Sequence, residues 1–375
     1  KPDVIESQDY NGIAYFLLQY KYCLFDWCRD VPVVVTMHSP NFLYMEYNEL
    51  PLYKQPNYWI GEMERFSIQA ADMLLSPSEY LISELKKRFV INNSNLHVLP
   101  NPYKAEELIH QQVVHSAILS NDLTFYGKLS PQKGTFKILE KFQELWESGF
   151  DKSFTMVGGQ DIVFPPLGKT MGKIVRKKYE KYIRTGLLKL KGRVAPADRA
   201  TLFAGSAIFI VPSIVDNLPY VVMELMAQGK ILIVSKQGGQ AEIISNTADG
   251  FIFDYDSPGS FEKTLHNVIK LGKEERLSVS EKASKKIKDQ YSYEKIYPVK
   301  IRLIEKLIKE HVTPQQFPFI RTLPGKKQSV DISGKGLLSV VIPFYNLGDY
   351  LNETVQSVLN STYKALEIII VNDGS

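Results

Sequence analysis

Short runs of β-branched and aromatic residues alternate with amphipathic stretches along most of the chain. The runs are apolar throughout rather than alternating with polar residues, which is typical of strands buried on both faces. They occupy residues 3–5, 33–37, 73–75, 97–99, 123–126, 154–157, 208–211, 231–234 and 251–253. Between them, apolar residues recur at three- and four-residue spacing, as at Phe136, Leu139 and Phe142. This alternation predicts an α/β chain whose parallel sheets are covered by helices.

Two breaks divide the 375 residues into domains. A proline-flanked turn at 100–102 leads into a polar stretch, so the first domain is expected to span residues 1–120. Strand–helix units then fill residues 121–311 and end with two helices, at 273–289 and 293–309. Residues 312–336 contain three prolines and three glycines and are interpreted as a linker. A last module, 337–375, stops inside a strand-to-loop turn, and the chain opens on a lysine, so we expect a piece of a longer protein.

Composition excludes several classes of protein. Hydrophobic residues make up 44% and charged residues 23% of the chain, which rules out a disordered protein. No apolar run approaches the roughly 20 residues of a membrane helix. Two cysteines, Cys23 and Cys28, cannot form a disulfide framework and favour a reducing, cytoplasmic compartment. The net charge of +4 is too small to indicate nucleic-acid binding, and the histidines show no metal-ligand spacing.

One segment departs from this even charge. Residues 169–193 contain ten lysines and arginines and a single acid, Glu180, so the segment carries a charge of +9. Two interpretations stay open. The segment is either a solvated helix face, or a surface that meets an acidic acceptor or the anionic head groups of a membrane to which the protein is peripheral.

The segment 211–229, V-P-S-I-V-D-N-L-P-Y-V-V-M-E-L-M-A-Q-G, predicts a strand end, a loop and a helix. Pro219 is expected at the first helical position and Gly229 just past the helix end. The amino end of such a helix points out of the carboxyl edge of the sheet and offers a phosphate site. The carboxylates of Asp216 in the loop and Glu224 in the helix could then hydrogen-bond to hydroxyl groups of two different rings around that phosphate. The alternative is a capping aspartate and a surface glutamate.

A second loop, G-K-L-S-P-Q-K-G at 127–134, follows a predicted strand and supplies Lys128 and Lys133. Lys133 would lie near the start of the next helix, where the helix dipole disfavours a cation, so a bound anion is expected to compensate it. The alternative is two solvated lysines beside a turn. Glycine pairs at 158–159 and 238–239 also follow predicted strands. They would let a ligand approach the backbone, or merely form turns.

Together, six blocks within residues 123–254 resemble the donor-binding domain of the family-4 glycosyltransferases. The blocks are Y-G-K-L-S-P-Q-K-G, M-V-G-G, L-K-G-R-V, L-F-A-G-S-A-I-F-I-V-P-S, D-N-L-P-Y-V-V-M-E, and G-G-Q-A-E-I-I followed by D-G-F-I-F. The resemblance implies the GT-B fold of two Rossmann-like domains, and sugar transfer from a nucleotide-sugar with retention of configuration. It implies no metal or other cofactor, because cationic side chains and a helix N-terminus stabilise the departing diphosphate.

The resemblance also implies roles for individual residues. Lys128, where the family usually has arginine, and Lys133 would contact the diphosphate. Glu224 matches the second acid of the family's paired-glutamate motif and would hold the ribose. Asp216, where the first glutamate is usual, would contact the transferred sugar. The remaining donor-binding residues are Gly127 and the stretch Asn217, Leu218, Pro219 and Tyr220, whose backbone would meet the phosphate and the sugar.

The first domain resembles the same family through K-P-D-V-I-E, P-V-V-V-T-M-H-S-P, E-R-F-S-I-Q-A-A-D-M-L-L-S-P-S-E and V-L-P-N-P-Y. His38, just beyond the predicted strand 33–37, would lie beside the reacting sugar; a structural histidine is the alternative. Glu64 is interpreted as structural. A complete first domain of the family has further strands and an acceptor loop before this point. We therefore expect a truncated first domain, and activity in the parent protein rather than in this fragment.

Residues 338–375 resemble the opening βαβ unit of a family-2 glycosyltransferase, which has the GT-A fold, through L-S-V-V-I-P-F-Y-N and E-I-I-I-V-N-D-G-S. The resemblance implies that Pro343, Tyr345 and Asp373 face a nucleotide. It places Asn372 where the family usually has an acid, and it implies a divalent metal bound downstream of this fragment. The alternative is an unrelated βαβ unit.

These expectations combine into one hypothesis: a retaining glycosyltransferase that serves a glycan or lipid-linked acceptor in bacterial surface polysaccharide synthesis. His38, Lys128, Lys133 and Asp216 are the expected catalytic residues. One alternative is a non-catalytic sugar-nucleotide or glycan-binding module that scaffolds a downstream glycosyltransferase. Another is an epimerase on the same two-domain architecture.

Overall fold

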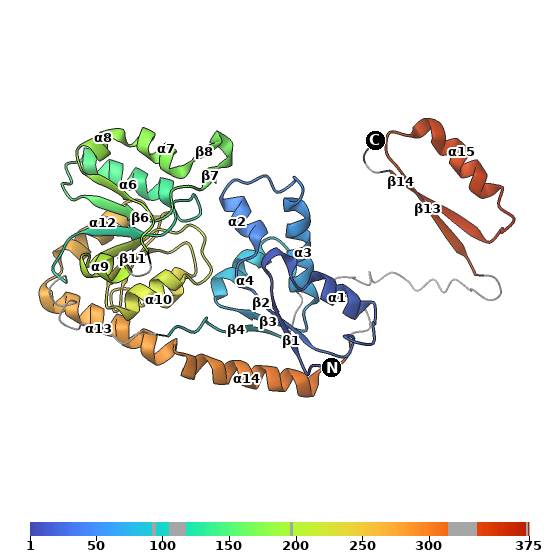
Figure 1. The fold of residues 1–375 in the computed structure, drawn as a ribbon, viewed down its shortest axis with the longest axis horizontal. Coiled ribbons are helices and arrows are strands. Elements are labelled where there is room, and N and C mark those ends of the chain that lie inside the picture. Colours follow the sequence, from blue (N-terminus) through green and yellow to red (C-terminus); the bar gives the residue numbers. More distant parts are fainter. Residues whose placement is uncertain (92–94, 105–117, 196–197, 314–335, 373, 375) are drawn as a thin grey trace. The chain divides into compact units, whose positions relative to one another are not determined.

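The structure, a computed structural model, describes residues 1–91, 95–104, 118–195, 198–313, 336–372 and 374. The chain forms two compact units, Lys1–Ile320 and Arg321–Ser375. The larger unit contains two lobes, here called the first lobe (residues 1–104) and the second lobe (residues 118–290), each built on its own sheet (Figure 1). Among the described residues, no helix is long and apolar enough to cross a membrane.

The first lobe holds a four-stranded parallel sheet in the order β1-β2-β3-β4. Its central strands are buried because they consist almost wholly of valine, leucine and methionine. The strands are β1 (Ile5–Gln8), β2 (Val33–Thr36), β3 (Met73–Ser76) and β4 (Leu96–Val98). The helices are α1 (Tyr15–Tyr22), α2 (Asn41–Tyr47), α3 (Asn57–Ala70) and α4 (Glu79–Lys86).

The second lobe holds a six-stranded parallel sheet in the order β12-β11-β10-β5-β6-β9. The strands are β5 (Leu123–Tyr126), β6 (Phe154–Val157), β9 (Leu188–Lys191), β10 (Ile208–Val211), β11 (Ile231–Ser235) and β12 (Phe251–Phe253). One apolar cluster packs α6 (Thr135–Glu147), α7 (Met171–Lys178) and α12 (Ser260–Lys270) onto the sheet. A second cluster packs α9 (Arg199–Ala204), α10 (Tyr220–Ala227), α11 (Gln240–Ile243) and α13 (Lys273–Gln290). Both faces are therefore covered, as the continuous apolar runs predicted.

The sequence prediction missed two features of the second lobe. Strand β9 reads L-K-L-K, with lysines at alternate exposed positions, so it has no apolar run; it is an edge strand, where lysine is common. A short antiparallel hairpin, β7 (Val163–Phe164) with β8 (Lys169–Thr170), precedes α7 and α8 (Glu180–Arg184). The predicted strand 3–5 was also misplaced, because β1 runs from Ile5 to Gln8 and reaches the polar Gln8 at the sheet edge.

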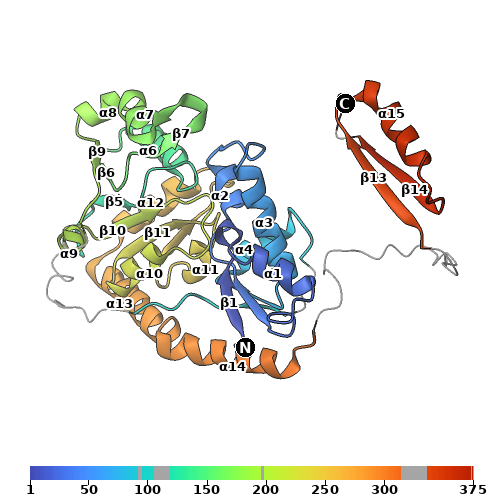
Figure 2. The same ribbon diagram turned by 45° about the vertical axis from the view of Figure 1, so that its right-hand side comes forward.

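Helix α14 (Tyr293–Glu310) follows the second lobe in sequence but ends on the first. Its Leu303, Ile304 and Leu307 pack on an apolar face of the first sheet that includes Val34 and Leu75. The two views agree that α14 runs along the base of the larger unit from one lobe to the other (Figures 1 and 2). The helix is thus a second connection between the lobes.

The smaller unit is a single parallel βαβ unit. Strands β13 (Leu338–Phe344) and β14 (Leu366–Asn372) pair over seven residues, and α15 (Gly348–Leu359) connects them. The predicted βαβ unit is therefore present in this module. Cys23 and Cys28, in the larger unit, are both free.

Candidate active site

A cavity of about 770 Å³ lies between the lobes at the carboxyl ends of the parallel strands. Nine of the ten residues predicted for the first two domains line it. From the first lobe comes His38, and from the second come Gly127, Lys128, Lys133, Asp216, Asn217, Leu218, Pro219 and Tyr220. Loops that lie far apart in sequence meet there because each follows a strand of one of the two sheets. We call this cavity the cleft.

The amino end of α10 faces the cleft, since Pro219, Tyr220 and Val221 all line it. The expectation that Pro219 is the first helical residue was wrong. It is the N-cap, with an extended ψ of 119°, and the helix begins at Tyr220. No side chain caps this end, so the first turn keeps N–H groups available for an anion. Gly229 has a φ of 65° directly after the helix, the left-handed conformation that was expected to close it.

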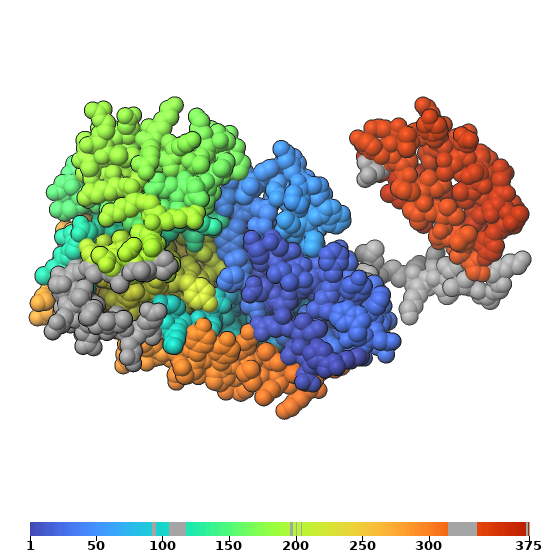
Figure 3. Space-filling model, in the orientation of Figure 1, coloured from blue at the N-terminus to red at the C-terminus, as the bar shows by residue number. Residues whose placement is uncertain are grey.

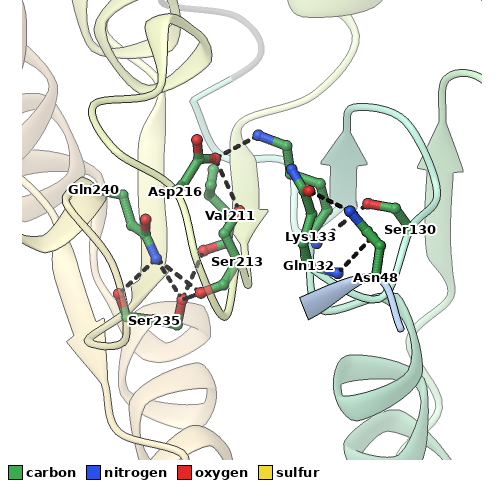
Figure 4. A network of polar contacts seen from close by, with 9 residues as sticks. All are labelled: Asn48, Ser130, Gln132, Lys133, Val211, Ser213, Asp216, Ser235 and Gln240. Atoms are coloured by element: carbon green, nitrogen blue, oxygen red, sulfur yellow. Dashed lines mark hydrogen bonds and ion pairs between the residues drawn. The ribbon is translucent and has the colours of Figure 1, made fainter. Parts of the chain in front are cut away.

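Asp216 and Lys133, which both line the cleft, form an ion pair (Figure 4). The Asp216 side chain also accepts a hydrogen bond from the Ser213 hydroxyl at 3.2 Å, and the residue is only 8% exposed. Asp216 therefore does not cap α10, which excludes the capping alternative. The compensating anion that was expected to be a ligand of Lys133 is, in this structure, the Asp216 carboxylate.

Lys128 is the neighbouring cation. The residue as a whole is exposed at the cleft, while the cleft walls partly bury its ammonium group. Among the described residues it has no ion-pair partner. Burial of its ammonium group, and then repulsion from Lys133, lower its pKa, while Asp216 acts in the opposite direction. A cation without a paired acid, next to a second cation, is well placed to receive a diphosphate.

Close backbone packing explains two glycines around the cleft. Gly158 has a φ of 145°, and a Cβ there would lie 1.9 Å from the carbonyl oxygen of Gly127. Gly134 has a φ of 75°, and its Cβ would lie 1.9 Å from the carbonyl oxygen of Pro212. Side chains at these positions would push apart the loops that carry the lysines and Asp216.

His38 lies just beyond β2, on the opposite wall from the lysines. Its backbone N–H donates to Asp9 Oδ1 at 2.9 Å. Although the residue as a whole is exposed, partial burial of its imidazole in the cleft lowers the pKa of His38, and the Asp216 carboxylate partly opposes this shift. Asp9 is fully buried, burial raises its pKa to about 6, and its Oδ2 has no hydrogen-bond partner among the described residues. No sequence pattern pointed to Asp9.

Glu224 is the one predicted residue of this site that does not line the cleft. It lies in the second turn of α10, and its carboxylate is 3.6 Å from Arg199 Nη1 on α9. Arg199 could not be found from the sequence, since it belongs to none of the matched blocks. Its ion pair with Glu224 means that the glutamate is a partnered, partly buried acid.

A second cavity of about 480 Å³ shares five residues with the cleft: His38, Ser39, Lys128, Lys133 and Asp216. The rest of its lining is aromatic and amide-rich and was not predicted. It includes Tyr10, Asn41, Tyr44, Asn48 and Gln132. Asn48 and Gln132 also hydrogen-bond each other across the lobes, with Gln132 N donating to Asn48 Oδ1 at 3.3 Å (Figure 4).

The structural interpretation of Glu64 is confirmed. Its buried carboxylate accepts hydrogen bonds from the backbone N–H groups of Asn11, Asn41 and Phe42 at 2.7 to 2.9 Å. It thereby holds the start of α2 and the turn after β1 below the second cavity.

All ten basic residues of segment 169–193 are exposed, at the surface of the second lobe (green in Figure 3). Three are held locally: Lys178 pairs with Glu140 at 3.1 Å, Arg193 with Asp161 at 2.7 Å, and Arg176 hydrogen-bonds Gln160. The other seven form no ion pair with the described residues. Arg193 and Asp161 also line the cleft, so the segment reaches its rim.

In the smaller unit, Pro343 lies on β13 and Tyr345 follows it with 57% of its side chain exposed. Asp373 lies outside the described residues. Among the residues that are described in the whole chain, no cluster of three histidine, cysteine or acidic side chains is arranged to hold a metal ion.

Comparison with known sequences gives three family matches. Residues 1–107 match glycosyltransferase family 4, residues 116–286 match the glycosyl transferases group 1, and residues 339–375 match glycosyl transferase family 2. Lipopolysaccharide 1,2-N-acetylglucosaminetransferase of Salmonella typhimurium is 23% identical over 237 residues, which cover 60% of this chain and 59% of that protein. Glycosyltransferase GlyG of Streptococcus pneumoniae is 56% identical over 39 residues, 10% of this chain and 13% of that protein. The chain thus spans less than two thirds of either relative.

Solved structures share the fold. Sucrose-phosphate synthase from Thermosynechococcus elongatus superposes with a TM-score of 0.63 at 15% identity, over 82% of this chain and 74% of that one. HepE from Anabaena, in complex with UDP and glucose, gives a TM-score of 0.56 at 16% identity, over 78% and 75%. The expected fold, two Rossmann-like domains with parallel sheets, is confirmed by these neighbours.

Proposed function

Because residues 1–107 and 116–286 belong to glycosyltransferase families and have the GT-B fold, we propose that this protein is a retaining, nucleotide-sugar-dependent glycosyltransferase. It would move a sugar to a glycan or lipid-linked acceptor in bacterial surface polysaccharide synthesis. The observation that carries the proposal is the cleft, where Lys128, the Lys133–Asp216 pair and the uncapped end of α10 converge opposite His38. The lipopolysaccharide transferase among the relatives supports the pathway.

Charge stabilisation in the cleft would drive the chemistry. As the bond between the anomeric carbon and the diphosphate breaks, negative charge grows on the diphosphate oxygens. Lys128 and the N–H groups of the first turn of α10 would stabilise that charge, and Lys133 would join them where the phosphate competes with Asp216 for its ammonium. We propose that this module uses no metal cofactor and that these fixed positive groups neutralise the leaving group. The HepE complex with UDP supports a uridine nucleotide as the first donor to test.

The remaining polar residues would hold the sugar and the nucleoside. His38 and Asp216 would contact the transferred sugar from opposite walls of the cleft, and the acceptor hydroxyl would attack on the face that the diphosphate leaves. Glu224 would hold the ribose, which requires its carboxylate to exchange Arg199 for a ribose hydroxyl. Gly127, Leu218 and Tyr220 would meet the donor through the loop backbone.

The second cavity would receive the acceptor. It opens beside His38 and Asp216, so a hydroxyl bound there would lie next to the transferred sugar. Its tyrosines can stack on sugar rings, and its amide side chains can both donate to and accept from hydroxyl groups. This lining supports a sugar as the group that accepts the transfer, whether or not a lipid carries it.

Binding is the first test. UDP-, GDP- and ADP-sugars are screened for a rise in the melting temperature of the 375-residue chain, and we expect one nucleotide class to raise it. The Gly158→Ala variant is the control, since its Cβ would displace the Gly127 loop. No stabilisation by any of them would refute the proposal. Stabilisation without nucleoside diphosphate release from the donor, in either the chain or its parent, would favour a scaffold, and release of an altered donor without acceptor would favour an epimerase.

We propose further that the basic segment 169–193 docks the protein on the anionic cytoplasmic face of a membrane. Seven exposed cations that form no ion pair with the described residues support this, at about 1 kcal/mol each near such a surface. Val163 and Leu167 in the adjacent hairpin are more than half exposed and would enter the lipid interface.

Flotation with phosphatidylglycerol vesicles should be lost on changing Lys173, Lys177 and Lys181 to Glu. The matched control changes three lysines of α13. Equal loss in both variants, or binding to phosphatidylcholine vesicles, would contradict docking by this segment.

For the smaller unit, residues 339–375 belong to glycosyl transferase family 2. We propose that Pro343, Tyr345 and Asp373 bind a second nucleotide-sugar in the parent protein. The divalent metal of that module would bind outside the residues present here.

A further inference from the structure

The side chain of Asn217 crosses from the second lobe to the first. Its Nδ2 donates to the carbonyl oxygens of Met37 at 3.0 Å and of His38 at 2.7 Å. Its Oδ1 accepts from the Ser78 hydroxyl at 2.6 Å. The residue is 3% exposed, so these three hydrogen bonds replace all of its contact with water.

We propose that Asn217 is a positioning residue that fixes His38 relative to Asp216 across the cleft. The inference rests on the proposed function, because it assigns Asn217 a purpose within that site. The family resemblance had placed only the backbone of Asn217 at the donor. The structure adds a separate task for its side chain, directed to the opposite lobe.

Both the N–H and the C=O group of the His38 backbone are hydrogen-bonded. Its N–H donates to the buried Asp9 of the first lobe, and its C=O accepts from Asn217 of the second. Asn217 directly follows Asp216, whose carboxylate is itself tied to Lys133 and Ser213. The Asn217 side chain therefore ties the backbone of His38 to the loop that carries the acid.

The backbone of Asp216 and Asn217 is packed closely against Gly239. Gly239 N donates to the carbonyl oxygen of Asp216 at 2.8 Å. A Cβ on Gly239 would lie 1.4 Å from the carbonyl oxygen of Asn217. This explains the glycine at 239, the second of the Gly238-Gly239 pair, and it makes the Asp216–Asn217 loop a rigid support for the side chain that reaches across.

The three bonds suit asparagine in particular. An amide supplies two N–H donors for the two carbonyls and one oxygen for the hydroxyl. Aspartate has no donor and would set a carboxylate against two carbonyl oxygens, and leucine would leave all three partners buried and unpaired. The side-chain chemistry thus matches its partners on the first lobe atom for atom.

The test reads His38 itself and needs no substrate. Histidine imidazole resonances are followed by NMR against pH in the full 375-residue chain, with His38 assigned by the His38→Gln variant. In Asn217→Ala, the His38 backbone is no longer tied to the second lobe, so the partly desolvated imidazole should become better solvated and its depressed pKa should rise toward 6.5, the ordinary value. Glu242→Ala is the matched control. It removes another cross-lobe contact, the one from Glu242 to the backbone N–H of Glu79 at 3.0 Å, and should leave His38 unchanged.

Circular dichroism melting establishes that both variants are folded before the comparison. An unchanged His38 in folded Asn217→Ala, or the same shift in Glu242→Ala, would overturn the inference. Once the screen has identified a donor, Asn217→Ala in the parent protein should lower kcat for donor turnover at least tenfold with KM changed less than twofold. Failure to find any donor would count against the proposed function, and the NMR result would still decide the role of Asn217.

Discussion

The ion pair between Lys133 and Asp216 predicts a measurable coupling energy. The side chain of Asp216 is only 11% exposed. Lys133→Met would leave its carboxylate with the Ser213 hydroxyl as its remaining side-chain partner. Breaking a buried pair costs about 3–5 kcal/mol, and the 20% exposure of Lys133 reduces this to about 2–3 kcal/mol. Asp216→Asn leaves an ammonium that reaches water and should cost about 1 kcal/mol. The double variant contains no unpaired charge, so it should lose about 2 kcal/mol less than the sum.

The unchanged protein, the two single variants and the double variant form a double-mutant cycle. Urea unfolding followed by circular dichroism measures the free energy of unfolding of all four. Lys128→Met is the matched control, because Lys128 has no ion pair with the described residues. It should change the free energy of unfolding by less than about 0.5 kcal/mol and weaken UDP binding about tenfold, as expected for one charged hydrogen bond. The reasoning is refuted if the cycle is additive within about 0.5 kcal/mol, or if Lys128→Met destabilises the protein as much as Lys133→Met does.

Two further predictions follow from the geometry. Gly158→Ala would set a Cβ 1.9 Å from the carbonyl oxygen of Gly127, so it should weaken nucleotide binding in calorimetry at least tenfold, while a matched Gly149→Ala, with open space around it, should bind normally. Burial raises the pKa of Glu64 to about 7, above its unfolded value of 4.5, so protonated Glu64 is favoured in the folded protein and stability should fall as pH rises. Between pH 5 and 8 the loss is about 2–3 kcal/mol. Urea unfolding of Glu64→Gln should lack this part of the pH dependence, and an identical slope in both proteins would contradict it.

Most of the fold was predictable because buried parallel strands leave a strong sequence signal. The apolar runs at Leu123–Tyr126, Phe154–Val157 and Ile208–Val211 match the observed strands residue for residue. Strand β9 was missed because an edge strand buries one face only, and its alternating lysines look like helix or loop. Helix α14 was predicted, but its packing on the first lobe was not, since periodicity reveals an apolar face and not its partner.

The site was predictable to the extent that it depends on strand ends. His38, Lys128 and Asp216 each follow a strand, and the sheets carry them to one cleft. Contacts between segments that lie far apart in the sequence could not be predicted from it. The pairing of Lys133 with Asp216 and of Glu224 with Arg199 joins separate loops and helices, and nothing in either segment encodes the distance between them. Asp9 was missed because a lone buried aspartate has no pattern.

Helix α14 sets the smallest piece of this chain that can fold. The sequence match to the second lobe ends at residue 286, inside α13. A protein shortened there would leave Val34, Met73 and Leu75 of the first sheet uncovered, since Leu307 buries them. It would also lose His311, which lies 3.3 Å from the buried Lys21 ammonium. A shortened protein that keeps only the larger unit should therefore extend to about residue 313. Amide exchange in the first lobe should be faster in any shorter piece.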